Sequence, residues 1–140
     1  RSTRVRSSAA SDVYKRQTGI FVLCMLFGFN HQQYVTMLPK SITTAIGIGI
    51  SEELGGIVTI TVAVIIITGI LGNVIADTVF HIFKIKNPLA KGLALGTASH
   101  AIGTARAIEM GPVEGAMSSL AVAVAGLLTV VFVSGFAQLI

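Results

Sequence analysis

The residues best suited to chemistry lie in two segments rich in glycine, serine and threonine. The first is residues 39–56, PKSITTAIGIGISEELGG, and the second is residues 92–115, GLALGTASHAIGTARAIEMGPVEG. Basic groups and hydroxyls in or beside these segments, together with unpaired N–H groups at helix starts, are suited to holding a carboxylate. The predicted substrate-binding residues are Lys40, Ser41, Thr43, Thr44, Thr97, Ser99, His100, Thr104 and Arg106.

Two of these residues have an equally good structural interpretation. His100 shares a four-residue spacing with Gly92, Gly96 and Thr104, so it projects from the narrow side of its helix. There it could serve as a ligand or proton carrier, or form a hydrogen bond between helices. Arg106 stands three residues before Glu109, a spacing that favours a salt bridge. Both stay in the predicted site because an ionisable residue inside a membrane segment is a functional hypothesis by default.

The sequence favours a protein that is not an enzyme. Ser99 and His100 are neighbours, but neighbouring helical side chains point about 100° apart and so do not form a nucleophile–base pair. The chain contains no G-x-S-x-G elbow, no Walker motif and no His/Cys metal cluster. The single Cys24 excludes a disulfide framework and offers no metal-ligand spacing. We therefore expect no catalytic residue, no metal and no cofactor.

The composition is that of a membrane protein. Hydrophobic residues make up 53% of the chain, charged residues 11%, and the mean hydropathy is +0.83. Residues 57–82 and about 114–140 are each long and apolar enough to cross a lipid bilayer. The lysines at 84, 86 and 91 predict a cytoplasmic loop between these spans. The predicted location is the cell membrane, as a multi-pass protein of the bacterial inner membrane.

The two glycine-rich segments are too polar to face lipid as ordinary helices and must line protein or water. Each contains Ala-Ile-Gly, at 45–47 and 101–103, followed by acidic residues, glycines and a long apolar span. This pattern indicates a degenerate internal repeat with a period of roughly fifty-six residues. The predicted fold class is an all-α integral membrane bundle of several spans with two glycine-rich broken or re-entrant helices. If each broken segment enters and leaves on the same side of the membrane, the two repeat units are inverted relative to each other. If each broken segment spans the membrane, the two units are parallel.

One polar stripe follows the first span. Gly69, Asn73, Asp77 and His81 recur every four residues, which places them on one side of a helix that should face protein. A packing seam of small residues with a hydrogen bond or two is favoured over a transport role for this stripe, because Asp77 and His81 lie toward the end of the span.

Residues 1–17 differ from the rest of the chain. They hold five basic residues against one acidic residue, while the remainder has five of each, so the net charge of +4 belongs to this leader. Its SSAASDVYKRQ string matches, codon by codon, the translation of a transposase adapter used in sequencing libraries. We expect a disordered, non-native leader rather than a natural basic tail, followed by the C-terminal part of a longer membrane domain at 18–140. A nucleic-acid partner is not expected.

Several strings in the chain carry a family resemblance. PKSITT, GISEELGGI, ITGILG, KGLALGTASHAIGTARA and EGAMSSLA together resemble the LrgB/CidB antiholin-like membrane proteins, from Leu38 to about Gly126. The resemblance implies control of murein hydrolase activity and autolysis with a small holin-like LrgA/CidA partner, and a plastid relative is a glycolate/glycerate translocator. This chain departs from the family at Ala45, where many members have proline, and at residues 73–77, NVIAD. The resemblance also implies that the family's N-terminal spans are missing from this sequence.

Two functions follow as hypotheses. The first is transport of small carboxylates resembling glycolate, lactate or pyruvate, for which the broken segments provide a mechanism. The alternative is an antiholin-like regulator of murein hydrolase activity that acts with an LrgA/CidA-type partner. Whether the protein forms a homo-oligomer is left open.

Overall fold

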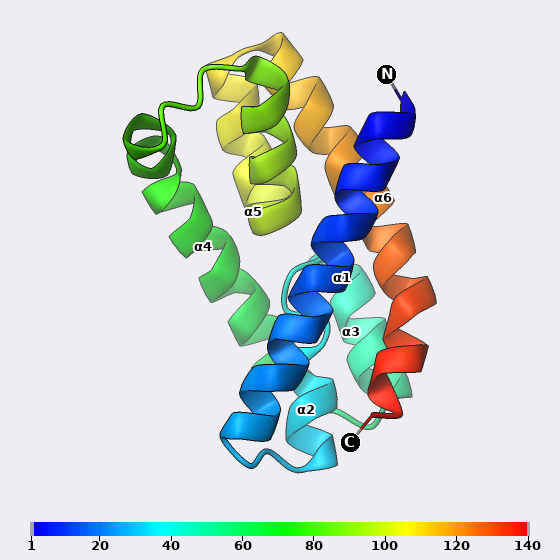
Figure 1. Cartoon of the computed structure of the whole chain (residues 1–140). Coiled ribbons are helices and arrows are strands. Elements are labelled where there is room, and N and C mark those ends of the chain that lie inside the picture. Colours follow the sequence, from blue (N-terminus) through cyan, green and yellow to red (C-terminus); the bar gives the residue numbers. More distant parts are fainter. Residues whose placement is uncertain (1, 140) are drawn as a thin grey trace.

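In the computed structural model, which describes residues 2–139 and all their side chains except those of residues 2–6 and 9, the chain is entirely helical (Figure 1). The described residues form six α-helices and no strand. The helices are α1 (Ser2–Leu26), α2 (His31–Met37), α3 (Thr44–Glu53), α4 (Val58–Ile82), α5 (Pro88–Met110) and α6 (Pro112–Ala137).

Helices α4 and α6 are long and apolar enough to cross a membrane. Both expose large apolar side chains, with Val74 on α4 and Val131 on α6 each 71% exposed. The two segments predicted to be spans are therefore helices of the length and apolar character that a membrane span needs. Helix α6 begins slightly earlier than expected, with Pro112 in its first turn, where the missing N–H of proline needs no partner.

Helices α2 and α3 form a helical hairpin, which we call the first hairpin. Its tip is the turn at residues 38–43, and α3 returns beside this turn, so that a β-carbon on Gly47 would lie 3.7 Å from the Pro39 carbonyl oxygen. The base packs on the first turns of α4. There the Thr61 hydroxyl donates to the Thr36 carbonyl at 2.9 Å and pairs with the Ser51 hydroxyl at 2.8 Å.

Helix α5 is broken and forms a second hairpin. His100 has φ 42° and ψ −127°, which ends the helix and reverses the chain. The returning half packs against the first half, since a β-carbon on Gly103 would lie 2.5 Å from the Leu95 carbonyl oxygen. Such close approach requires glycine. The second glycine-rich segment is thus interrupted at the histidine that the sequence analysis singled out.

The two hairpins enter the molecule from opposite ends (Figure 1). The first has its base beside the start of α4, whereas both ends of α5 lie near the end of α4, where Lys91 Nζ is 5.8 Å from the centre of the Phe80 ring. The tip of the second hairpin reaches the middle of α4, where Gly69 and Gly72 accommodate His100 and Ser99.

The stripe predicted on α4 is only partly correct. Gly69 is buried and Asn73 is half-buried, but Asp77 and His81 are exposed. The buried face instead comprises Thr61, Ile65, Gly69, Ala76 and Phe80. Four residues turn a helix through slightly more than one revolution, so a strict four-residue repeat drifts by about 40° at each step and leaves the protein-facing side by His81.

Residues 2–17 of the leader lie in helix α1 and are not disordered as expected. Val13, Gln17, Ile20 and Cys24 recur at helical spacing and are all buried, which extends α1 through the leader without interruption. The Tyr14 ring lies 5.9 Å from the ring of Phe136 on α6. The non-native origin of residues 1–17 stays a prediction.

Candidate functional site

The tips of the two hairpins meet in the interior and bring most of the predicted site residues into one region. Lys40, Ser41 and Thr43 lie in the tip of the first hairpin, and Thr44 begins its returning helix. Thr97, Ser99 and His100 lie at the tip of the second hairpin, while Thr104 and Arg106 follow on its returning half.

Arg16 of α1 links the two tips. Its Nη1 atom donates to the Ser41 carbonyl at 2.9 Å and to the Thr97 carbonyl at 2.5 Å. In an unbroken helix the Thr97 carbonyl would accept a hydrogen bond from a backbone N–H in the next turn. The break at His100 removes that turn, so the carbonyl is available to Arg16. Arg16 is absent from the residues predicted above because it lies in the leader; the burial periodicity of Val13, Gln17 and Ile20 is the signal that points to it.

Two polar side chains at the second tip are buried without a partner. The Ser99 hydroxyl and His100 Nε2 make no hydrogen bond to any described residue, and these residues are 1% and 3% exposed. Buried polar groups are normally paired, and an unpaired one costs roughly 1–3 kcal/mol. Such a pair at the tip of a broken helix marks the place where a polar ligand would restore the missing hydrogen bonds.

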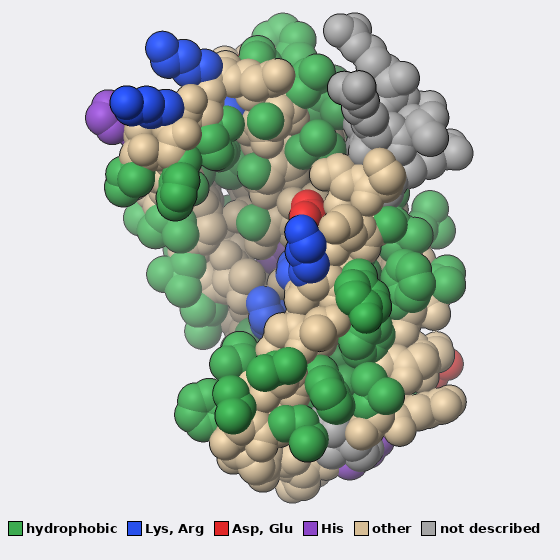
Figure 2. All heavy atoms as spheres, viewed as in Figure 1, with side chains coloured by type: hydrophobic (Ala, Val, Ile, Leu, Met, Phe, Trp, Pro, Cys, Tyr) green, Lys and Arg blue, Asp and Glu red, His purple; other side chains and the backbone are tan. Residues whose placement is uncertain are grey.

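Positive charge surrounds this place. The Lys40 ammonium group donates to the Ser41 hydroxyl at 3.1 Å, and the charges of both Arg16 and Lys40 act on His100. The returning helices α3 and 101–110 both begin at the tips, so their unpaired N–H groups face the same region. At the start of α3, Thr43 forms no side-chain capping bond, which leaves these groups available. Figure 2 shows basic side chains and part of a histidine in this central part of the molecule.

Thr104 stabilises the break rather than adding a free donor. Its hydroxyl donates to the His100 carbonyl at 2.8 Å and lies 2.8 Å from the Ser118 hydroxyl of α6. The Thr104 side chain thereby ties the break at His100 to α6.

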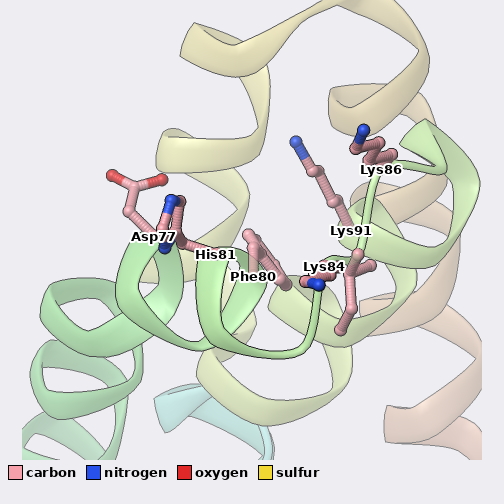
Figure 3. Close-up of a pocket in the computed structure, with 7 residues that line it drawn as sticks. Asp77, Phe80, His81, Lys84, Lys86 and Lys91 are labelled. Atoms are coloured by element: carbon pink, nitrogen blue, oxygen red, sulfur yellow. The ribbon is translucent and has the colours of Figure 1, made fainter.

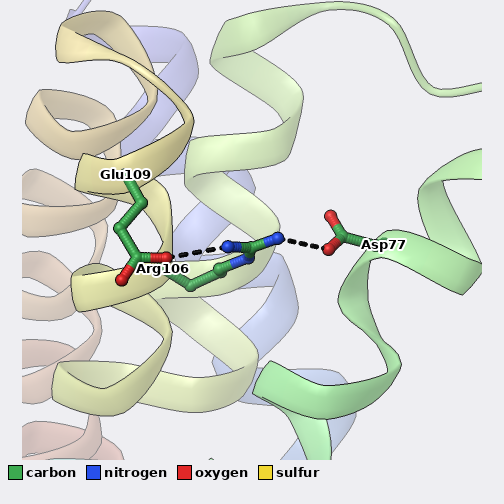
Figure 4. Close-up of polar contacts among 3 residues, drawn as sticks. All are labelled: Asp77, Arg106 and Glu109. Carbon is green, nitrogen blue, oxygen red and sulfur yellow. Dashed lines mark hydrogen bonds and ion pairs between the residues drawn. The ribbon is translucent and has the colours of Figure 1, made fainter.

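Arg106 does not join the tips. It forms salt bridges with Asp77 of α4 at 2.5 Å and with Glu109 at 2.7 Å, and its side chain is 36% exposed (Figure 4). The Glu109 bridge is the structural alternative predicted from the spacing, and it is confirmed. The Asp77 bridge, which the sequence analysis did not foresee, fastens the returning half of α5 to α4.

The contacts of the two hairpins match at an offset of fifty-six residues. Ser41 and Thr97, whose carbonyls share the Arg16 nitrogen, are separated by this offset. So are two glycine contacts, that of Gly47 with the Pro39 carbonyl and that of Gly103 with the Leu95 carbonyl.

The hairpins also pack on the long helices in a matching way. Ile102 of the second hairpin rests on Gly69 of α4, and Ile46 of the first hairpin rests on Gly126 of α6. Each hairpin therefore contacts the long helix that follows the other hairpin. The isoleucines again differ by fifty-six positions and the glycines by one more.

Comparison with known proteins places these features in a family. Residues 12–139 match the LrgB-like family. The chain is 44% identical over 117 residues to antiholin-like protein LrgB of Bacillus cereus (strain B4264) and, equally, to that of Bacillus anthracis (strain CDC 684 / NRRL 3495). These alignments cover 84% of this chain and 51% of each relative, so the chain spans about half the length of the curated relatives it matches. No solved structure matches. The chain belongs to the LrgB-like family of antiholin-like membrane proteins.

Proposed function

We propose that this protein transports small carboxylates, of the glycolate, lactate or pyruvate type, across the bacterial inner membrane and carries out no chemical reaction on them. The observation that carries the proposal is the pair of buried, unpartnered polar groups, Ser99 Oγ and His100 Nε2, at the tip of a broken helix. Buried polar atoms of this kind are satisfied when a ligand with oxygen acceptors binds.

The architecture supports this proposal. Secondary transporters bind their substrates near the bilayer midplane, between inverted repeats whose helices are interrupted there. We infer that each repeat unit here is one re-entrant hairpin followed by one spanning helix, first α2–α3 with α4 and then α5 with α6. The matching contacts at an offset of fifty-six residues and the entry of the hairpins from opposite ends are what an inverted pair requires.

The chemistry of the tips suits a carboxylate. Lys40 offers an ammonium group, Ser99 and His100 offer donors, and two helix N-termini present N–H groups with a partial positive charge. No carboxylate among the described residues forms a salt bridge with Lys40 or His100, in contrast to Arg106, which is already paired with two. A carboxylate substrate would therefore enter an electropositive site whose donors are not all engaged.

Proteoliposome uptake of labelled glycolate, lactate and pyruvate tests this proposal, with the full-length Bacillus cereus relative assayed in parallel. Ser99→Ala and His100→Gly should abolish saturable uptake. Glycine is the replacement of choice at position 100 because it adopts φ 42° without strain and so preserves the turn. Thr59→Val, which removes a hydroxyl from the exposed side of α4, is the matched control. Absence of saturable flux with both proteins, or full flux in both tip variants, would count against transport.

A second function rests on the name of the relatives, antiholin-like protein LrgB. Under this alternative the protein regulates murein hydrolase activity and autolysis together with a small LrgA/CidA-type holin-like membrane protein. The experiment is a deletion strain complemented with the wild-type gene or with the His100→Gly variant, combined with co-purification of the partner. Unaltered autolysis on deletion and no co-purifying partner would argue against regulation. Restored autolysis control by a variant that cannot transport would separate the two functions.

A further inference from the structure

A cavity lies at the end of α4, away from the hairpin tip that contacts the middle of this helix. It has a volume of about 580 Å³ and opens to the surface between the end of α4, the turn that follows and the start of α5 (Figure 3). It is lined by Asp77, Phe80, His81, Lys84, Ile85, Lys86 and Lys91.

The cavity carries an excess of positive charge. Three lysines line it, from the turn and from the first turn of α5, and His81 lines it from α4. Figure 3 shows Lys86 and Lys91 pointing to the same side, with the end of Lys84 apart from them. The single acidic residue in the lining, Asp77, is already paired with Arg106. Lys91 lies over the face of Phe80, with Nζ 5.8 Å from the ring centre, which orients its charge at the cavity wall. An anion entering the cavity would therefore meet several cations and no free carboxylate.

An apolar groove borders this cavity. It has a volume of about 150 Å³, runs between α4 and the first half of α5, and shares Phe80 with the basic cavity. Its lining is almost entirely apolar and consists of Gly72, Ile75, Ala76, Val79, Phe80, Ala94, Leu95, Ala98 and Ser99. One of these lining residues, Ile75 of α4, is 51% exposed, so the groove is open at the surface. A charged cavity joined to an apolar groove has the two-part character of a phospholipid.

The position along α4 agrees with this chemistry. The basic cavity lies at the end of α4, a helix long and apolar enough to span a membrane. The positive-inside rule places this end of the helix on the cytoplasmic side, level with the lipid headgroups. Basic pockets between transmembrane helices on this side of a membrane bind anionic headgroups. Figure 2 shows basic and histidine side chains gathered at one end of the molecule, directly above apolar side chains.

We propose that this site binds one anionic phospholipid of the cytoplasmic leaflet, with its phosphate among Lys84, Lys86 and Lys91 and an acyl chain in the groove between α4 and α5. The phosphate site shares no residue with the carboxylate site, whereas the groove reaches Ser99 at the tip of the second hairpin. A lipid bound there would bridge α4 and the second hairpin at the same level as the Arg106–Asp77 ion pair.

The test measures lipid that stays with the chain after transfer from nanodiscs into detergent, by native mass spectrometry. Nanodiscs of phosphatidylcholine alone are compared with nanodiscs that also contain phosphatidylglycerol. We expect selective retention of phosphatidylglycerol. Lys86→Gln and Lys91→Gln should each lower its retention roughly fivefold, which corresponds to the about 1 kcal/mol that a basic residue contributes near an anionic membrane. Lys15→Gln, an identical change at an exposed site outside the cavity, is the control and should have no effect.

The groove is tested separately. Ala98→Phe adds a ring at the groove without changing any charge, so it should lower phosphatidylglycerol retention while leaving binding of glycerol 3-phosphate, the free headgroup analogue, unchanged. Two outcomes would overturn the proposal. Equal losses in Lys91→Gln and Lys15→Gln would indicate only general attraction to an anionic surface. Full retention in Ala98→Phe, with glycerol 3-phosphate competing for the site, would assign the cavity to a soluble phosphate compound.

Discussion

Gly69 of α4 makes room for the imidazole of His100. A β-carbon at position 69 would lie 2.9 Å from His100 Cε1 and 2.8 Å from Ile102 Cδ1. Both of these atoms belong to the tip of the second hairpin, so a glycine in the middle of a spanning helix determines how closely the candidate site approaches it.

Gly69→Ala should therefore destabilise the protein, because the added methyl group would overpack the contact with the hairpin tip. Overpacking of this kind costs roughly 1–3 kcal/mol. The measurement is thermal unfolding in detergent. Gly49→Ala in α3 is the control, since a β-carbon there has nothing within 4 Å and alanine favours the helix. Equal melting temperatures for the two variants would show that His100 is not packed on Gly69.

His100→Gly should be more stable than His100→Ala, although both remove the imidazole. The backbone at φ 42° and ψ −127° strains any residue with a β-carbon, and such strain is worth of order 1–3 kcal/mol. Differential scanning fluorimetry of the two variants measures the difference. If alanine is tolerated as well as glycine, the chain does not reverse at position 100 in the way described.

Thr61→Val should destabilise the base of the first hairpin. The Thr61 hydroxyl pairs with the Thr36 carbonyl and the Ser51 hydroxyl inside a fully buried contact, and its loss would leave buried polar groups unpaired. We expect a loss of roughly 1–3 kcal/mol in the free energy of unfolding. The same change at exposed Thr59 should be close to neutral when compared by chemical unfolding.

Arg106→Gln should leave saturable carboxylate uptake in place, because Arg106 bridges Asp77 and Glu109 outside the hairpin tips. Its bridges are exposed, so their contribution to stability should be small and should shrink further as salt is added. Uptake and melting temperature at low and high ionic strength provide the check. If the variant folds normally but no longer takes up carboxylate, Arg106 is part of the binding site after all.

The spans and the broken segments could be predicted from the sequence because they depend on local properties. The length of their apolar runs predicts α4 and α6, and a high glycine content identifies the two segments that form hairpins. The face of α4 that packs could not be predicted from a four-residue repeat, since helical drift leaves His81 exposed and brings Asp77 to the edge of the packed face, where it pairs with Arg106. The meeting of Ser41 with Thr97 was also beyond reach, because it depends on two tips that approach from opposite ends of the molecule.

The glycine contacts that join the two halves have a mechanical consequence. Ile102 rests on Gly69, and Ile46 rests on Gly126, so at both crossings an isoleucine meets a backbone that carries no side chain. In each case the isoleucine occupies the space that a side chain would fill, so the two surfaces interlock as a ridge in a groove. For one half of the molecule to rock against the other and expose the tips to either side in turn, each isoleucine would have to leave its glycine notch, so these two crossings are where such a movement would be resisted.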